Sequence, residues 1–440
     1  MNNKEKLDLA HWVVAESKKT GANDVSVNIS NSRDISVSFL DSKLDQLNES
    51  TQNSLSLNIY ANNRFSGHTT NDLRRESLKS FIQKAVSMTG YLSEDPHRRL
   101  PDPKYYAGRK DIDLKLVDSH YDSIKAEQRV ELAKELEAIG RTGDSKVVSC
   151  SGEYGDTYSE SVKVHSNGFE GERQVTVFYV YTEVTIDDGN GGRPQDYDYI
   201  VSNHFNKLPS PKQISENAIK RVLRKIGQKK IASGKFDMII ENRRASRLIA
   251  ALAGPWGGRA LQQRTSFLEG KVGEKIASEK LTLVDNPFIP EGRGSRLYDG
   301  EGMATKKRLI IDKGVLKQYF INNYYASKLE VEPTGGSTTN IIANQGDRSL
   351  DEMVKSMKKG ILVTDFLGGN SNGTTGDFSY GIVGQLIEDG KVVHPVNEMN
   401  ISGNLGEILN QLVELGNDPY INSSWRLPSL KFEGVDFSGV

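Results

Sequence analysis

Apolar and polar residues follow two different patterns in the first quarter of the chain. Residues 4–19 place their leucines and valines on or near one side of a helix, which predicts an amphipathic helix. From residue 25 to residue 60, apolar and polar residues alternate between short Asn- and Ser-containing turns, which is typical of an antiparallel meander. The pattern then predicts a second helix over residues 73–89.

The next part of the chain repeats this change of pattern after a break. Residues 95–116 are rich in proline and charge, so we place a domain boundary there. Residues 124–139 carry apolar residues at near-helical spacing, and residues 214–231 predict another helix. Between these helices the sequence predicts strands at 147–152, 160–166, 174–186 and 197–205, with a glycine-rich loop at 187–194.

The last 200 residues favour strands joined by glycine turns. A buried strand is predicted at 236–240, followed by a helix at 244–253 that stops at Gly254-Pro255. Hairpins are signalled by Asp312-Lys313-Gly314 and by Asp389-Gly390. The final helix is predicted at residues 404–415.

Together these elements predict an α+β fold, with N-terminal α/β layers and antiparallel sheets followed by a β-rich C-terminal domain of mostly antiparallel strands. We expect residues 1–95 to form a helix plus an antiparallel meander, and residues 115–232 to form a central helix and antiparallel sheet. Residues 233–440 are then the β-rich domain. At 440 residues, the chain is long enough for each domain to bury its own core.

Composition excludes several classes of protein. The 57 basic and 58 acidic side chains nearly cancel, so no global field attracts nucleic acid or acidic lipid. No run of about 18 apolar residues occurs, so we expect no membrane span. The first residues lack a signal-peptide pattern, and the single Cys150 cannot form an internal disulfide, so a cytoplasmic protein is expected.

Metal-ligand spacing is missing from the chain. The seven histidines are scattered, and no HExxH, CxxC or HxH pattern occurs. A zinc peptidase needs two imidazoles within about one or two helical turns and a carboxylate beside them. We therefore predict no catalytic residue and no metal ligand of this kind, while a site assembled from distant segments stays open.

Three local patterns have both a functional and a structural interpretation. G-x-S-x-G occurs around Ser371, but the sequence after it predicts a strand instead of the helix of a nucleophile elbow, so a flexible glycine loop is favoured. Basic residues at 219–230 could contact phosphates, but the wet face of a helix explains them more simply. Four aspartates near the 187–194 loop could hold calcium, but their spacing favours a solvated hairpin tip. These aspartates are Asp187, Asp188, Asp196 and Asp198.

Glycine loops in the last domain also leave two interpretations open. They lack the GxxxxGK and GxGxxG contexts, so phosphate binding has little support. They could let a peptide backbone approach a sheet edge, where main-chain hydrogen bonds accept many sequences. As plain turns they need no function. The candidate peptide-binding positions are Gly335, Gly336, Gly368, Gly369, Gly373 and Gly403.

Several long segments, in order, resemble one known family. They are SNGFEG (166–171), TSFLEGKVGEKIASEKLTLVDNP (265–287), DGEGMATKKRLIIDKGVLKQYFINNYYASKLEVEPTGG (299–336), the glycine-rich stretch 362–390, and PVNEMNISGNLGEILNQLVELGNDPY (395–420). The chain resembles the TldD/PmbA family, called modulators of DNA gyrase in older usage, and within it the TldE (PmbA) branch. The resemblance covers nearly the whole chain.

The resemblance implies a two-subunit protease of the cytosol that degrades unfolded peptides and trims precursors of small modified peptides. Its TldD subunit holds a metal, expected to be zinc, through HExxxH and a late cysteine, and its TldE subunit lacks them. Counted back from residues 265–267, the histidine positions fall near Ile249 and Gly254, and the glutamate near Ala250. The late cysteine position falls at residues 422–424 and is also empty.

Isoleucine, alanine and glycine side chains cannot bind zinc or act as a general base, so the resemblance and the residue chemistry agree. Because positions i and i+5 lie about 140° apart on a straight helix, TldD must bend or end its helix there, and Gly254-Pro255 would end it in this chain too. Gyrase modulation finds no support in these residues.

We therefore expect a non-catalytic TldE-type subunit, without a cofactor of its own, that pairs with a TldD-like subunit and handles unfolded peptides. The first alternative is a homodimer that binds peptides or another protein without protease activity. The second is an autonomous hydrolase with an unrecognised site. No nucleic acid and no membrane is expected as a partner.

Overall fold

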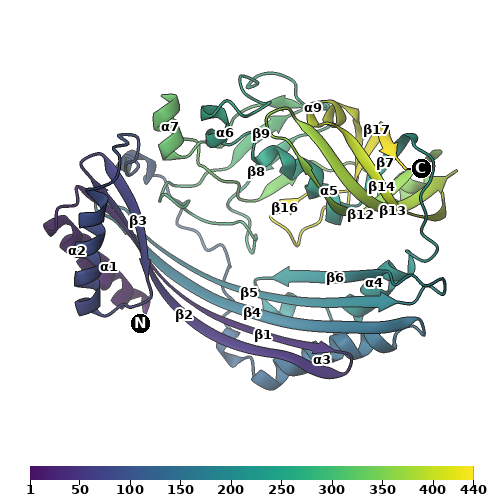
Figure 1. The fold of residues 1–440 in the computed structure, drawn as a ribbon, viewed down its shortest axis with the longest axis horizontal. Coiled ribbons are helices and arrows are strands. Elements are labelled where there is room, and N and C mark those ends of the chain that lie inside the picture. The colour runs from purple at the N-terminus through teal and green to yellow at the C-terminus, as the bar shows by residue number, and fades with distance from the viewer. Residues whose placement is uncertain (440) are drawn as a thin grey trace.

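The computed structural model describes residues 1–439, in which a long curved sheet faces a strand-rich C-terminal half (Figure 1). The sheet is six-stranded and antiparallel, in the order β3-β2-β1-β4-β5-β6. β1 pairs with β4 from Ser26–His165 to Leu40–Ser151, so segments far apart in the chain form its middle. The strands are β1 (Asp24–Leu40), β2 (Lys43–Ala61), β3 (Arg64–Thr70), β4 (Val147–His165), β5 (Glu170–Ile186) and β6 (Gln195–Ser202).

Four helices cover the convex face of this sheet (Figure 1). α1 (Asn3–Lys19) and α2 (Arg75–Thr89) pack at one end, where Val13 and Ile82 share a core with Ile29 of β1. α3 (Ala126–Thr142) and α4 (Pro211–Leu223) pack at the other end, where Leu136 and Ile214 share a core with Phe178 of β5. Burial of these alternate strand residues holds the helices on one face only.

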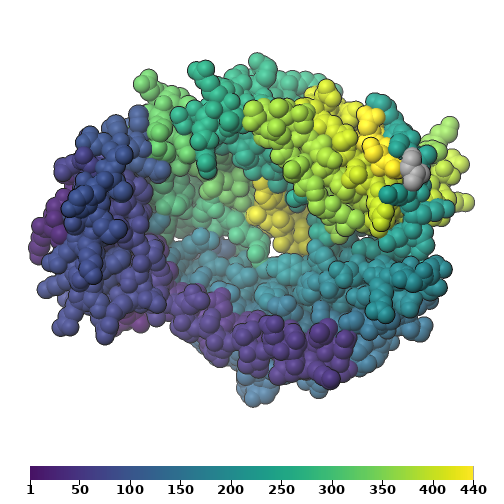
Figure 2. All heavy atoms as spheres, in the orientation of Figure 1, coloured from purple at the N-terminus to yellow at the C-terminus, as the bar shows by residue number. Residues whose placement is uncertain are grey.

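The concave face is polar. Because successive strand residues point to opposite faces, the positions between the buried ones of β1 and β2 turn toward the C-terminal half. Many of them are serines and amides, such as Asn28 beside Ser56 and Ser30 beside Ser54. Figure 2 shows an opening between this face and the C-terminal half.

Two sheets build the C-terminal half. One has the order β14-β13-β12-β7-β17-β15, and an additional β14–β17 pairing closes five of its strands into a ring. The other has the order β10-β9-β8-β11-β16. Only the β7–β12 and β11–β16 pairs within these sheets are parallel among the described residues. The strands are β7 (Gly234–Ile240), β8 (Leu283–Asp285), β9 (Arg308–Asp312), β10 (Val315–Leu316), β11 (Ile341–Ala343), β12 (Lys359–Ser371), β13 (Asp377–Glu388), β14 (Lys391–Asn404), β15 (Leu412–Leu415), β16 (Trp425–Arg426) and β17 (Leu430–Ser438).

The helices of this half are short. They are α5 (Asn242–Ile249), α6 (Gly258–Gln262), α7 (Asn323–Leu329), α8 (Leu350–Lys355) and α9 (Leu405–Ile408). Single 3-10 turns lie at η1 (Pro103–Tyr105), η2 (Tyr121–Ser123), η3 (Phe205–Lys207), η4 (Ala250–Ala253) and η5 (Leu409–Gln411). In the part of the chain that the structure describes, no helix has the length and apolar character needed to span a bilayer.

The predicted fold class is confirmed, including the antiparallel sheets and the β-rich C-terminal half. Both predicted hairpins are present, as β9–β10 and β13–β14. The first two predicted domains contribute three strands each to one sheet. The proposed boundaries at 1–95, 115–232 and 233–440 stay a prediction.

Two predicted helices differ from the structure. The helix predicted at 404–415 is wrong in its second half, because Leu412 and Leu415 pair with β17 as strand β15. The helix predicted at 214–231 ends at Leu223, and Gly227 adopts a positive φ of 75° a few residues later. In both places a local apolar pattern suited a helix, and the neighbouring strands or turns determined the backbone.

Candidate functional site

The segment at which the resemblance places metal ligands is α5 and the turn after it. α5 runs from Asn242 to Ile249 and tightens into η4 at Ala250–Ala253. The chain leaves the helix at Gly254, and Pro255 follows. The predicted stop at Gly254-Pro255 is therefore present, with a 3-10 turn in place of the last helical residues.

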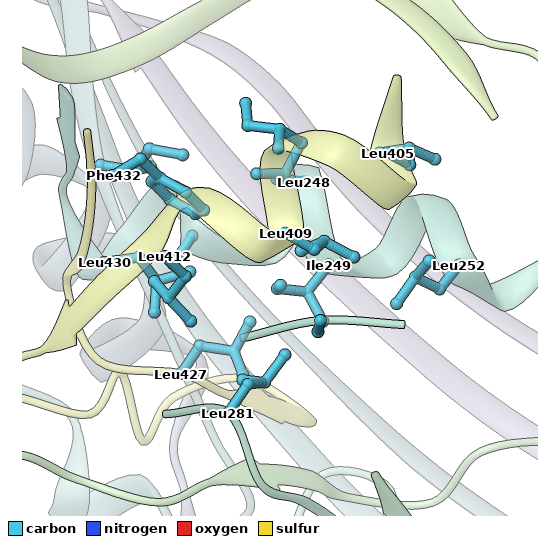
Figure 3. Packing of buried hydrophobic residues seen from close by; sticks show 14 of the residues in the cluster. Leu248, Ile249, Leu252, Leu281, Leu405, Leu409, Leu412, Leu427, Leu430 and Phe432 are labelled. Atoms are coloured by element: carbon cyan, nitrogen blue, oxygen red, sulfur yellow. The ribbon is translucent and has the colours of Figure 1, made fainter. Parts of the chain in front are cut away.

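One side of this segment is entirely apolar (Figure 3). Leu248, Ile249 and Leu252 have no exposed surface. They belong to the largest hydrophobic cluster of the described residues. The surrounding side chains labelled in Figure 3 are Leu281, Leu405, Leu409, Leu412, Leu427, Leu430 and Phe432. Ile249 therefore lies among carbon atoms, where a charged ligand would be strongly disfavoured.

The other two aligned positions also offer no donor atoms. Ala250 is half-buried and Gly254 is exposed. A Cβ atom on Gly254 would meet nothing within 4 Å, so space is available but no ligand is. The residues at the expected metal positions do not fit a zinc ion, which needs N, S or O ligands. Among residues 1–439, no three His, Cys, Asp or Glu side chains are grouped to hold a metal ion.

The opposite side of α5 is basic and attached to neighbouring elements. Arg244 pairs with Asp365 of β12 at 2.9 Å, and it donates to the Tyr197 hydroxyl of β6 at 2.9 Å. Arg243 forms an ion pair with Asp198 of β6. These contacts hold α5 against the edge strand of the curved sheet, so the arginines have structural partners and are not free to act on a substrate.

The late cysteine position lies in the loop between β15 and β16. Residues 422–424 are half-buried there, and the Ser424 carbonyl accepts the Ile341 amide at 2.8 Å. The only cysteine, Cys150, is buried in β4 beside α4. Burial raises the pKa of the Cys150 thiol to about 12, so this side chain is a neutral thiol at pH 7.

The candidate glycines fall into two separate groups. Gly368, Gly369, Gly373 and Gly403 lie on the β12–β13–β14 end of the ring. Arg247 of α5 donates to the Gly369 carbonyl at 2.9 Å, which places this group beside the aligned positions. At Gly369 an added Cβ would lie 2.2 Å from the Ser379 carbonyl oxygen, so this glycine is required by strand packing.

Gly335 and Gly336 lie elsewhere, in the loop after α7. Gly335 has a φ of +93°, and the Arg308 guanidinium lies 3.1 Å from the position of its missing Cβ. The two glycine groups therefore do not form one continuous peptide-binding edge.

The other local patterns have structural explanations. Ser371 ends β12 and is followed by β13, so no helix lies behind it as a nucleophile elbow requires. Asp188 accepts the Asn190 and Gly192 amides in the β5–β6 turn. Asp196 pairs with Arg221 from the predicted basic helix. The four aspartates are thus divided between a turn and ion pairs.

Sequence reasoning missed a group of buried charges at the junction of the curved sheet and the C-terminal half. Asp285 has no exposed surface, pairs with Arg308 and accepts the Thr339 amide at 2.6 Å. Asp299 accepts the backbone amides of Glu301 and Met303 at 2.9 and 3.0 Å. The only signal in the sequence was the spacing of carboxylates and glycines in DGEG, which does not reveal burial.

Burial controls the titration of this junction. It raises the pKa of Glu301 to about 7, against a smaller lowering by the Asn323 amide, which Glu301 accepts at 2.8 Å. It lowers the pKa of Lys163, which donates to the Gly300 carbonyl. It also lowers the pKa of His165 to about 3, so this imidazole is neutral at pH 7. All three shifts follow from the cost of a charge away from water.

Comparison with known proteins assigns the class. Residues 233–439 match the PmbA/TldA metallopeptidase C-terminal domain, and residues 119–226 match the central domain of the same family. The chain belongs to the PmbA/TldD family. The predicted family membership is thereby confirmed.

Individual relatives cover nearly the whole chain. The metalloprotease PmbA of Escherichia coli O157:H7 is 28% identical over 431 residues, covering 96% of this chain and 94% of the relative. A crystal structure from Bacteroides thetaiotaomicron, of a proposed modulator of DNA gyrase, has 42% identity and a TM-score of 0.97, with 100% of both chains covered. The TldE structure from Thermococcus kodakarensis has a TM-score of 0.87 at 22% identity, covers 98% of this chain and 100% of its own, and shows a shared fold.

Proposed function

We propose that this chain is a non-catalytic TldE-type subunit, which completes a metallopeptidase with a TldD-like partner and helps to present unfolded peptides to the partner's metal, expected to be zinc. The observation that carries the proposal is the apolar packing around Ile249. Where the metallopeptidase subunit would need an imidazole, this chain buries an isoleucine among leucines. The complex would act in the cytoplasm.

The chain's own residues support binding and positioning only. The arginines of α5 are engaged with Asp198 and Asp365, and no general base lies beside Ile249. The glycines at 368–373 and Gly403 present strand backbone beside α5, where a peptide in extended form would find main-chain partners.

The test is cleavage of an unfolded peptide by this chain mixed one to one with the TldD-like protein of the same organism, against each protein alone. We expect activity in the mixture and its loss with a chelator. Ser371→Ala removes the hydroxyl of the G-x-S-x-G pattern while keeping its main-chain groups, and it should leave that activity unchanged. Stoichiometric metal and chelator-sensitive cleavage by this chain alone would contradict the proposal.

A second experiment tests the glycine group. At Gly403 an added Cβ would lie 3.5 Å from the Phe378 ring, which is an ordinary contact. Gly403→Ala should therefore fold, and if a peptide lies along this edge it should raise the KM of the mixture with little change in kcat. An unchanged KM would remove Gly403 from the peptide-binding positions.

A further inference from the structure

Arg296 is a half-buried cation that forms no ion pair with any of the described residues. Its Nη2 atom donates to the Ser337 hydroxyl at 2.8 Å and to the Thr338 carbonyl at 2.7 Å. Its Nε is buried without a hydrogen-bond partner. No carboxylate of residues 1–439 lies within ion-pair distance of this guanidinium, whose pKa is lowered by burial.

The nearest carboxylates are already committed. Asp285 pairs with Arg308 and accepts from Thr339, and Asp299 accepts two backbone amides. Both carboxylates raise the pKa of Arg296 only through longer-range attraction. The positive charges of Arg173 and Arg308 lower that pKa again. A positive charge held in this way is costly unless an anion joins it.

Arg296 also lines two cavities. The smaller has a volume of about 290 Å³ and is lined by Lys306, Arg308 and Asp299 as well as Arg296. Lys306 has no acidic partner among the described residues either, whereas Arg308 is neutralised by Asp285. The smaller cavity therefore has an excess of positive charge that a single negative charge would nearly balance.

The larger cavity has a volume of about 640 Å³ and a partly apolar wall. Ile112, Leu114, Leu297 and Tyr298 line it together with Arg296. Ile112 is 42% exposed, which leaves its apolar surface available to a ligand. A ligand that carries a carboxylate directly beside an apolar group would satisfy both sides of Arg296.

We propose that Arg296 binds the terminal carboxylate of a peptide, with the apolar side chain of the last residue in the cavity lined by Ile112 and Leu297. The last residue of a peptide carries its terminal carboxylate and its side chain on the same α-carbon. The carboxylate can therefore bind Arg296 while the side chain lies in the larger cavity. Guanidinium binds a carboxylate through parallel hydrogen bonds. This inference deepens the proposed function, on which it rests for the choice of peptide as the ligand.

The test measures fluorescence anisotropy of this chain alone with a labelled, unstructured peptide that ends in leucine. The same peptide with an amidated C-terminus should bind about 10-fold more weakly or worse, since a charge-assisted hydrogen bond is lost. A peptide ending in glutamate should also bind more weakly, because its last side chain would lie against Ile112 and Leu297. Equal binding of the free and amidated peptides to the unaltered chain would overturn the proposal.

Variants locate the site. Arg296→Gln keeps a donor for Ser337 and should weaken the free-carboxylate peptide about 10-fold while leaving the amidated peptide unchanged. Lys307→Gln is the matched control, because Lys307 is exposed, lines neither cavity and changes the net charge equally. It should change binding less than about 2-fold. An equal loss with Lys307→Gln would attribute the effect to general charge and overturn the assignment to Arg296.

Two further measurements keep folding apart from binding. The thermal midpoint of free Arg296→Gln should change little, since the loss of hydrogen bonds to Ser337 and Thr338 is offset by removal of a half-buried charge without a counter-charge. Ile112→Asp tests the apolar cavity at a partly exposed position and should weaken only peptides that end in an apolar residue. If it leaves their binding unchanged, the placement of the last side chain is wrong.

The outcome is separate from that of the proposed function. Binding of the terminal carboxylate is measured without a TldD-like protein. No gain of cleavage on mixing, together with carboxylate-dependent binding here, would contradict the subunit role and leave the Arg296 site standing. A gain of cleavage on mixing, together with equal binding of the free and amidated peptides, would support the subunit role and overturn the Arg296 site.

Discussion

Two buried regions of the C-terminal half differ in the side chains that they contain: one is apolar and the other is charged. Beneath α5, Leu248 and Ile249 are surrounded by carbon atoms. At the junction with the curved sheet, Asp285 and Arg308 are equally buried but are paired and hydrogen-bonded. The difference shows that this half buries apolar side chains in one region and charges in another, where each charge has a partner. Arg296 is half-buried without such a pair, and it is the cation for which we propose a ligand.

The largest effect is expected from breaking the charged pair. Arg308→Met leaves Asp285 buried without its counter-charge and should lower the free energy of unfolding by about 3–5 kcal/mol. Urea denaturation measures the loss. The double variant Asp285→Asn/Arg308→Met should recover much of it, and a loss below about 1 kcal/mol in the single variant would show that Asp285 is solvated.

The apolar region should lose somewhat less. Leu248→Ala removes a fully buried side chain and should cost about 3 kcal/mol of unfolding free energy through lost burial and a residual cavity. Leu309→Ala is the matched control, since Leu309 is 38% exposed. It should cost less than about 1 kcal/mol. Similar losses at the two positions would mean that the packing beneath α5 is loose.

Glu301 makes the junction sensitive to pH. Its pKa is raised from the ordinary 4.5 to about 7, so the folded chain holds this proton more tightly than the unfolded chain. Its contribution to stability is therefore complete below pH 4.5 and is lost as the pH rises to 7. The loss amounts to roughly 3 kcal/mol, from a shift of about 2.5 pKa units at 1.36 kcal/mol per unit.

The measurement compares the unaltered chain with Glu301→Gln in urea at several pH values. The stability of the unaltered chain relative to the variant should fall between pH 4.5 and 8. Because both proteins share every other titrating group, a constant difference would show that Glu301 keeps an ordinary pKa.

The smallest effect is expected at the surface. Arg348 forms an ion pair with Glu414 and its side chain is 41% exposed. Arg348→Ala should lower the free energy of unfolding by less than about 1 kcal/mol, and added salt should remove the difference. A loss comparable to that of Arg308→Met would mean that exposure does not separate the two pairs.

Much of the fold could be predicted because its signals are local. Alternation along residues 25–60 predicted an antiparallel meander, and glycine turns predicted both hairpins of the C-terminal half. The four short strands expected at 25–29, 35–40, 44–47 and 55–60 are wrong in number, because β1 and β2 each run continuously through the turns expected inside them. The pairing of β1 with β4 was not predictable, since it depends on contacts between segments far apart in the chain. The same dependence explains Leu412 and Leu415, whose spacing suited a helix until β17 supplied hydrogen-bond partners.

The candidate site divides in the same way. Residue identity by itself determined that Ile249, Ala250 and Gly254 offer no metal ligand, because donor chemistry belongs to the side chain and not to its surroundings. Packing of the chain places Ile249 among leucines, raises the pKa of Glu301 to about 7, and leaves Arg296 without a counter-charge. Burial and the distance to the nearest opposite charge arise only when the chain packs. The sequence identifies the ionisable groups, but their pKa values and their contributions to stability depend on that packing.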